Sequence, residues 1–225
     1  EDSMLSGLIC QAETLGIQSK GMYVYAKHFA LNDQETLRHG ICTFASEQTI
    51  RENYLKAFEY VLAADRGNGH AAMTSFNRIG VVWAGAHEGL LTNVLRGEWG
   101  FDGFTITDCW TDIGESANSG NYFGNAAGAV LAGGDTLDGT PEGAYNDKAL
   151  KNSPTFCQAL RESTKRICYV QVNSSAMNGL ASDFEVARLT SWWQTALYAV
   201  DAVLAVLVAL CVVMLARSGG RKEKK

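Results

Sequence analysis

The first residue in this sequence whose position suggests chemistry is an aspartate at the end of an apolar segment. Residues 103–110, GFTITDCW, are apolar and β-branched up to Asp108, which closes a short predicted strand. A carboxylate at that position costs free energy unless it is exposed, paired or used. Asp108 could be a helix N-cap or a turn residue, or it could be a functional group. The segment alone leaves both interpretations open.

Polar side chains also follow two other predicted strands. Lys27 and His28 come at the end of the β-rich segment 22–29, and Ser75, Phe76 and Asn77 lie at or just after the end of the short segment 71–76. When strands run parallel, their carboxyl ends meet at one edge of the sheet, where α/β barrels hold their chemistry. We therefore expect these side chains to gather around the aspartate.

The elements that must position these residues alternate along the chain. Short strand-like segments are separated by segments with helical character, at residues 5–20, 47–64, 90–100 and 154–171. That order favours parallel strands with helical crossovers. A doubly wound sheet shares the pattern, but no G-x-G-x-x-G follows a strand. The predicted fold class is therefore α/β, as a TIM (β/α)8 barrel.

The composition fits a globular body joined to a membrane segment. Hydrophobic residues make up 47% of the 225 residues and charged residues 19%, with 23 glycines and 2 prolines. Abundant glycine with little proline suits an α/β protein better than a disordered one. The chain begins at Glu1 without a methionine or a signal peptide. We therefore expect it to be the end of a longer protein.

A transmembrane helix is predicted at residues 197–216, LYAVDAVLAVLVALCVVMLA, which are apolar apart from Asp201. Twenty residues match one helical crossing of a bilayer. The domain before it spans 1–178, and 179–196 is an amphipathic juxtamembrane linker. The tail, 217–225, carries five basic residues and one glutamate, which predicts a cytoplasmic C-terminus, single-pass insertion in the cell membrane and an extracytoplasmic domain. A buried core helix is the alternative interpretation.

Several classes of partner are disfavoured. The six cysteines show no C-x-x-C and no Cys/His cluster, so no metal site is expected and the thiols are predicted to be free and buried. The part of the chain before the basic tail is acidic and has no interleaved basic and aromatic residues. No nucleic acid is therefore expected as a partner.

Four motifs in order carry a family resemblance. They are KHFALNDQET, EQTIRENYLKAFE, MTSFNRIG and LLTNVLRGEWGFDGFTITD. In this order and spacing they resemble the barrel domain of family 3 glycoside hydrolases over about residues 1–140, and AGGDTLD (132–138) resembles a late barrel strand. The resemblance implies a partial TIM (β/α)8 barrel that contains the later strands only.

The resemblance also implies a retaining β-glycosidase with Asp108 as its nucleophile. Retention needs two carboxyl groups about 5 Å apart, one to attack the anomeric carbon and one to protonate the leaving oxygen. Carboxylates and water suffice for this mechanism, so no cofactor is expected. The implied substrate is a β-linked oligosaccharide or glycoside, and the missing K-H-F-P-G-H-G loop disfavours the hexosaminidase branch.

Further site residues follow from the same resemblance. Lys27 and His28 match the pair that holds sugar hydroxyls, and Met73 and Phe76 match positions lining the same subsite. Lys27 could instead form a salt bridge, and His28 could be a satisfied core histidine. Trp110 could stack on a sugar face or pack in its loop.

The chain departs from the family pattern at two positions. Many members have tyrosine where this chain has Phe76, and tryptophan where it has Cys109, directly after the nucleophile. The polar residues Asn32, Gln34, Glu35 and Arg38 are interpreted as a structural hydrogen-bond network.

The second carboxylate is not identifiable from the sequence. Asp112 and Glu115 follow the nucleophile and could donate a proton, although loop solvation and capping are their simpler roles. In most of the family the acid/base is a glutamate from a separate sandwich domain. We expect upstream polypeptide to complete the barrel and supply this group. The alternative is a non-catalytic, membrane-anchored sugar-binding or structural remnant.

Overall fold

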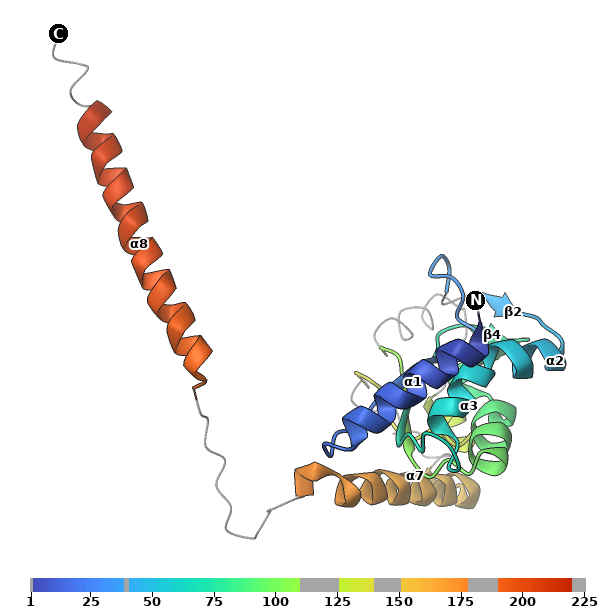
Figure 1. Cartoon of the computed structure of the whole chain (residues 1–225). Helices are drawn as coiled ribbons and strands as arrows, with labels where there is room; N and C mark the ends of the chain where they lie inside the picture. The colour runs from blue at the N-terminus through green and yellow to red at the C-terminus, as the bar shows by residue number, and fades with distance from the viewer. Residues whose placement is uncertain (1, 39–40, 110–125, 140–150, 178–189, 220–225) are drawn as a thin grey trace. The chain divides into compact units, whose positions relative to one another are not determined.

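The computed structural model describes residues 2–38, 41–109, 126–139, 151–177 and 190–219 (Figure 1). Two compact units make up the chain, residues 1–179 and residues 180–225.

A parallel sheet organises the first unit. It has the order β1 (Tyr25–Phe29), β3 (Ala71–Thr74), β6 (Phe104–Thr107), and a parallel bridge joins Ile106 of β6 to Thr136. The predicted parallel strands with helical crossovers are thus confirmed. The described strands form an open sheet and do not close into a barrel.

Helices connect these strands, as the sequence pattern predicts. Asp2 caps the first of them, since its Oδ1 accepts hydrogen bonds from the backbone N–H groups of Met4 and Leu5. Ser153 caps the last one by accepting from Phe156 N, and Pro154 occupies its first turn. The elements are α1 (Ser3–Gln18), α2 (Glu47–Thr49), π-helix η1 (Ile50–Tyr54), α3 (Lys56–Leu62), π-helix η3 (Gly89–Glu98), α5 (Ala126–Leu131), α7 (Pro154–Asn173) and the short 3₁₀-helix η4 (Ser175–Met177).

One face of the sheet packs on helices. Phe29 of β1 and Ala72 of β3 are fully buried against Leu62 of α3 and against Leu91 and Leu95 of η3. Successive strand side chains point to opposite faces. Residues of the other face are half-buried or exposed, as Met73, Ile106 and Tyr25 are. The helical layer therefore fixes the strands and leaves their ends accessible.

A second, small sheet was not predicted. It consists of β2 (Cys42–Thr43), β4 (Arg78–Ile79) and β5 (Val82–Trp83), followed by the 3₁₀-helix η2 (Ala84–Ala86). β4 and β5 are antiparallel, and the turn between them has Gly80 at a positive φ of 60°. This sheet ties the loop after β1 to the segment after β3.

All six cysteines are free, as predicted. The predicted burial is wrong, because Cys10, Cys157, Cys168 and Cys211 are exposed and Cys42 and Cys109 are intermediate. Cys10 and Cys157 lie on the solvent sides of α1 and α7, which only one helix face buries.

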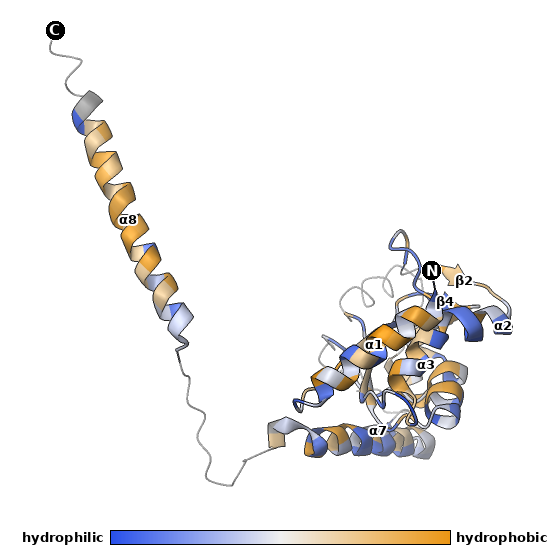
Figure 2. Ribbon diagram, viewed as in Figure 1, coloured by the Kyte–Doolittle hydropathy of each residue, from blue (hydrophilic) through white to orange (hydrophobic). Residues whose placement is uncertain are grey.

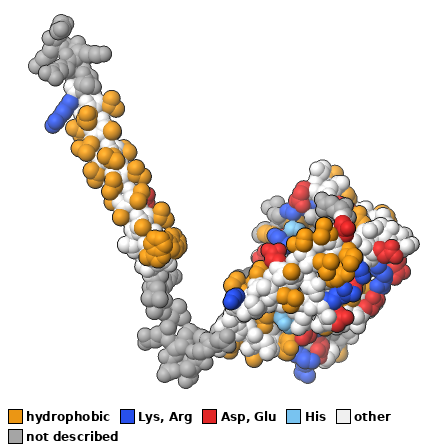
Figure 3. Space-filling view, viewed as in Figure 1, with side chains coloured by type: hydrophobic (Ala, Val, Ile, Leu, Met, Phe, Trp, Pro, Cys, Tyr) orange, Lys and Arg blue, Asp and Glu red, His pale blue; other side chains and the backbone are white. Residues whose placement is uncertain are grey.

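The second unit contains one long helix, α8 (Trp192–Gly219). Its surface is apolar along nearly all of its length (Figure 2) and orange side chains cover it in the space-filling view (Figure 3), whereas charged and apolar groups mix on the first unit. By length and composition, residues 192–217 could cross a membrane, and this is the one such helix in the described residues. The predicted span, 197–216, lies inside it.

Candidate functional site

Asp108 lies directly after β6, at the carboxyl end of the parallel sheet. Its backbone N–H donates to Thr74 O at 3.2 Å, which extends the pairing with β3 to the aspartate itself. Its Oδ1 accepts a hydrogen bond from the backbone N–H of Cys109 at 2.9 Å. The side chain is 17% exposed, so the strand end holds the carboxylate in a fixed place while leaving it reachable.

His28 of β1 approaches the other carboxylate oxygen. Its Nε2 lies 3.3 Å from Asp108 Oδ2. The pKa of His28 is lowered, chiefly because burial disfavours the imidazolium; Asp108 opposes this effect, while Lys27 and Arg38 add to it. The imidazole is therefore neutral at pH 7, and its Nε2–H tautomer can donate to the carboxylate.

The loop after β1 brings an arginine to the same place. Arg38 Nη1 lies 2.9 Å from Glu35 Oε2 and 3.9 Å from Asp108 Oδ2. Asn32 Nδ2 donates to Glu35 at 3.2 Å. The predicted polar network therefore exists, but it also reaches the nucleophile candidate. The sequence feature that could have predicted this contact is the position of Arg38, three residues after Glu35 in a loop that follows a strand end.

Met73 belongs to the neighbouring strand β3, and Phe76 follows the end of that strand. Phe76 is 2% exposed and its ring carries the Arg38 guanidinium, with 4.4 Å between Arg38 Cζ and the ring centroid. Met73 is half-buried and pairs in register with Ile106, two residues before Asp108. Met73 thus lies on the strand that neighbours β6, and Phe76 lies two residues after that strand ends.

Lys27 is placed differently from its neighbour. It is exposed and lines a cavity of about 320 Å³ between α1, β1 and α3, together with residues such as Thr14 and Phe58. In the part of the chain that the structure describes, no hydrogen bond or ion pair joins Lys27 to Asp108. The structure therefore brings His28 to the carboxylate and leaves Lys27 beside the open edge of β1.

Three residues considered from the sequence, Trp110, Asp112 and Glu115, lie outside the described residues. Among those described, no group of three histidine, cysteine, aspartate or glutamate side chains could hold a metal ion.

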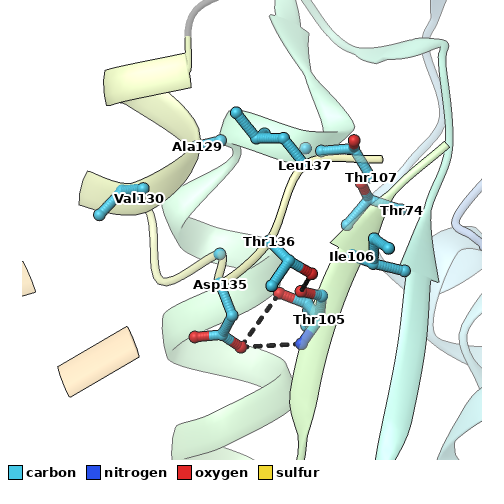
Figure 4. Close-up of a pocket in the computed structure, with 11 residues that line it drawn as sticks. Thr74, Thr105, Ile106, Thr107, Ala129, Val130, Asp135, Thr136 and Leu137 are labelled. Carbon is cyan, nitrogen blue, oxygen red and sulfur yellow. Dashed lines mark hydrogen bonds between the residues drawn. The ribbon is translucent and has the colours of Figure 1, made fainter. Parts of the chain in front are cut away.

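A second aspartate, which the sequence did not single out, occupies a buried ion cluster. Asp135 accepts from Arg96 Nη2, from Arg166 Nε and from the backbone N–H of Thr105, each at 2.7 Å. Figure 4 shows this carboxylate reaching the Thr105 backbone and hydroxyl. The adjoining cavity, about 10 Å³, is far too small for a sugar ring. Burial lowers the pKa of Arg96 to about 10, and Asp135 opposes the shift, so this arginine is still charged at pH 7.

The two clusters differ in what they can do chemically. Asp108 keeps acceptor capacity and access, with a neutral imidazole and a guanidinium beside it. The Asp135 side chain is fully buried and is bound by two arginines and a backbone N–H. A carboxylate of the first kind can attack an electrophilic carbon, and one of the second kind holds strands and helices together.

These features define an α/β domain with an accessible carboxylate at the carboxyl end of its parallel sheet. Residues 1–170 match the Glycosyl hydrolase family 3 N terminal domain, and the chain belongs to this family. The predicted family resemblance is thus confirmed.

Individual relatives agree with this assignment. One is a "Beta-glucosidase" of Ruminococcus albus, 42% identical over 115 residues, which make up 51% of this chain and 12% of that protein. Another is an "Exo-alpha-(1->6)-L-arabinopyranosidase" of Bifidobacterium longum, 40% identical over 122 residues, or 53% of this chain and 16% of that protein. The chain thus spans well under a fifth of the length of these relatives.

Solved structures show the same fold. A β-glucosidase from Paenibacillus barengoltzii is 27% identical with a TM-score of 0.68, over 84% of this chain and 21% of that one. β-Glucosidase 3B from Thermotoga neapolitana, in complex with glucose, is 29% identical with a TM-score of 0.62, over 78% of this chain and 24% of that one.

Proposed function

We propose that this chain belongs to a retaining β-glucosidase in which Asp108 is the nucleophile. The observation that carries the proposal is the position of Asp108 at the carboxyl end of β6, with one oxygen held by Cys109 N–H and the other facing His28. In a retaining enzyme such a carboxylate attacks the anomeric carbon and forms a covalent glycosyl-aspartate, which water then hydrolyses.

Neighbouring side chains support this role. Arg38 places a positive charge 3.9 Å from Asp108 Oδ2, so a cation and the proposed nucleophile face the same site. His28 and Lys27 are proposed to bind sugar hydroxyls, with Met73 and Phe76 bordering the same subsite. Trp110 is proposed to stack on the sugar.

The substrate is proposed to be a β-glucoside. The Ruminococcus albus relative is named a β-glucosidase and the Thermotoga neapolitana structure contains glucose. The Bifidobacterium longum relative is named for a different sugar, so the match to the family does not by itself fix the sugar.

The proposed mechanism also needs an acid/base. In retaining enzymes the two carboxyl groups are about 5–5.5 Å apart. The carboxylate linked to this cluster in the described residues is Glu35, which is 72% exposed and paired with Arg38. We therefore propose that upstream polypeptide completes the barrel and supplies the acid.

Covalent trapping tests the nucleophile. A 2-deoxy-2-fluoro β-glucoside with a good leaving group should glycosylate the complete protein as the leaving group departs, and peptide mapping should place the sugar on Asp108. Label on another carboxylate would refute the assignment. Asp108→Asn is the matched control and should take up no label.

The chain by itself is predicted to be catalytically silent. General acid assistance contributes about 10²–10⁴-fold, and an open sheet edge at β1 leaves the sugar site incomplete. Residues 1–178 should be assayed on an aryl β-glucoside with and without upstream polypeptide. Turnover by the isolated part at the rate of the complete protein would contradict this prediction. Sugar binding without turnover in the complete protein would favour the alternative of a non-catalytic remnant.

Membrane anchoring through residues 197–216 is proposed as well. The 26-residue apolar helix and the basic residues after it support a single crossing with the C-terminus in the cytoplasm. Protease added to intact cells should digest the first unit and spare an epitope tag on the C-terminus. Protection of the first unit would reverse the topology.

A further inference from the structure

A stacked arginine lies between the buried core and the candidate nucleophile. The Arg38 guanidinium lies 4.4 Å above the Phe76 ring centroid. Phe76 is 2% exposed and packs in a cluster with Trp83, Ala126 and Ala129. The ring is therefore a fixed surface, because its surroundings leave it little freedom to turn or shift.

A second contact of Arg38, with Glu35, constrains its position less than the ring does. Glu35 binds the guanidinium at 2.9 Å, but its side chain is 72% exposed. Exposed ion pairs are screened by water and constrain long side chains poorly. A cation over an aromatic face gains more when it is partly desolvated, and the Arg38 side chain is only 25% exposed.

This ring has no hydroxyl with which to reach the carboxylate itself. Its face is the part that contacts a charged group, and that group is Arg38. Arg38 in turn lies 3.9 Å from Asp108 Oδ2. The contacts thus run from a buried apolar cluster, through one ring and one guanidinium, to the candidate nucleophile.

We propose that Phe76 is a positioning residue for this site, whose ring holds the Arg38 guanidinium beside Asp108. The expected effect of Phe76 on catalysis rests on the proposed function, whereas its effect on the position of Arg38 does not. Without the ring, the Arg38 guanidinium loses this fixed surface and with it its place beside the carboxylate.

His28 gives a readout that needs no turnover. The charged groups facing it are Asp108, Lys27, Arg38 and Glu35. Asp108 and Glu35 raise the pKa of His28, whereas Lys27 and Arg38 lower it. Displacement of Arg38 removes one lowering influence, so the His28 titration midpoint must move upward.

The decisive variant is Phe76→Leu, which keeps an apolar side chain and removes the ring. In the complete protein, kcat/KM should fall about tenfold, equivalent to about 1.4 kcal/mol, a size within reach of a desolvated cation–π contact. Phe76→Tyr and Phe76→Trp keep an aromatic face and should restore most of the loss.

Phe101→Leu is the matched control. Phe101 is 3% exposed and also lies under an arginine, with Arg96 Cζ 5.4 Å from its ring centroid. Arg96, the arginine over this ring, is not a residue of the proposed sugar site. Phe101→Leu should lower stability as Phe76→Leu does, yet leave kcat/KM per folded molecule unchanged.

A double-mutant cycle separates positioning from packing. In an Arg38→Met background, Phe76→Leu should add little to the loss of kcat/KM, because the group it positions is absent. Full additivity of the two losses would overturn the proposal.

NMR titration of His28 in the full chain closes the test. Phe76→Leu and Arg38→Met should each raise the His28 midpoint, and Phe101→Leu should not. If the midpoints move but the wild-type protein cleaves no glycoside, the proposed function fails and the positioning role stands. If glycosides are cleaved but neither kcat/KM nor the midpoint responds to Phe76→Leu, the positioning role fails and the proposed function stands.

Discussion

Asp108 directly follows β6 and Asp135 binds Thr105 within that strand, yet the surroundings of the two carboxylates are opposite. Asp108 is 17% exposed and accepts from one backbone N–H, with His28 at 3.3 Å and Arg38 at 3.9 Å. The Asp135 side chain is fully buried and is bound at 2.7 Å by two arginines and a backbone N–H. One carboxylate retains access to solvent, and the other is closed off from it.

This difference shows how one residue type serves two purposes in one domain. A fully buried carboxylate is tolerated because two guanidinium groups and hydrogen bonds replace its water. An accessible carboxylate needs less compensation, and its looser partners can give way to a substrate. Access to solvent, more than charge, therefore distinguishes the candidate nucleophile from the buried aspartate.

The largest expected effect comes from Asp108→Asn. In the complete protein kcat should fall by about 10⁴-fold or more, because the amide cannot form the glycosyl intermediate. The melting temperature should change little, since the side chain is partly exposed. Steady-state kinetics and thermal unfolding of the same preparation check both halves. A large loss of stability would mean that Asp108, like Asp135, stabilises the fold.

Asp135→Asn should show the converse pattern. Removing one charge from a buried cluster leaves Arg96 and Arg166 facing each other, with an expected cost of about 3–5 kcal/mol. Denaturant unfolding measures this cost. Turnover per folded molecule should stay close to wild type, and a selective loss of kcat in a stable variant would contradict the structural role.

His28→Ala and Lys27→Ala sharpen the description of the functional side. Each substitution leaves a hydroxyl of the bound sugar without its partner, which is expected to weaken sugar binding by about 1–3 kcal/mol. Ground-state and transition-state binding should weaken together, because hydroxyl contacts exist in both. Calorimetry with a monosaccharide inhibitor measures the first and kcat/KM the second. Unchanged inhibitor affinity would make the residue structural.

The smallest effect concerns acid stability away from the site. Burial lowers the pKa of His87 below 6.5, and His87 Nδ1 accepts from Leu90 N at 3.1 Å. Between the lowered pKa and 6.5 the unfolded chain binds more protons, so stability falls as pH falls through that window. His87→Gln should therefore lose less stability between pH 7.5 and pH 5 than wild type, by denaturant unfolding. An identical pH response in both proteins would assign the acid sensitivity elsewhere, with His28 as the next group to test.

Much of the framework around Asp108 could be predicted from the sequence. Apolar periodicity placed β1, β3 and β6, and a polar residue at each strand end indicated which side chains would meet. The contact between His28 and Asp108 follows from that logic. The small sheet could not be predicted, because strands of two residues, such as Cys42–Thr43, have no periodicity.

The contacts that could not be predicted join residues that lie far apart in the sequence or in a loop that folds back. Arg38 reaches Asp108 only because its loop folds back over Phe76, and a local pattern does not encode that path. Asp135 pairs with Arg96 and Arg166, which lie 39 and 31 positions away. A single sequence gives no measure of such pairing.

That long separation has a consequence for the order of synthesis. Arg166 follows Asp135 by 31 residues, and at about 5–20 residues per second a ribosome needs about 2–6 s to add them. Until then the nascent chain holds Asp135 with an incomplete set of partners. Thr105, three residues before Asp108, is bound to the same carboxylate. The strand that presents Asp108 is thus locked only after α7 has emerged, late in translation of this domain.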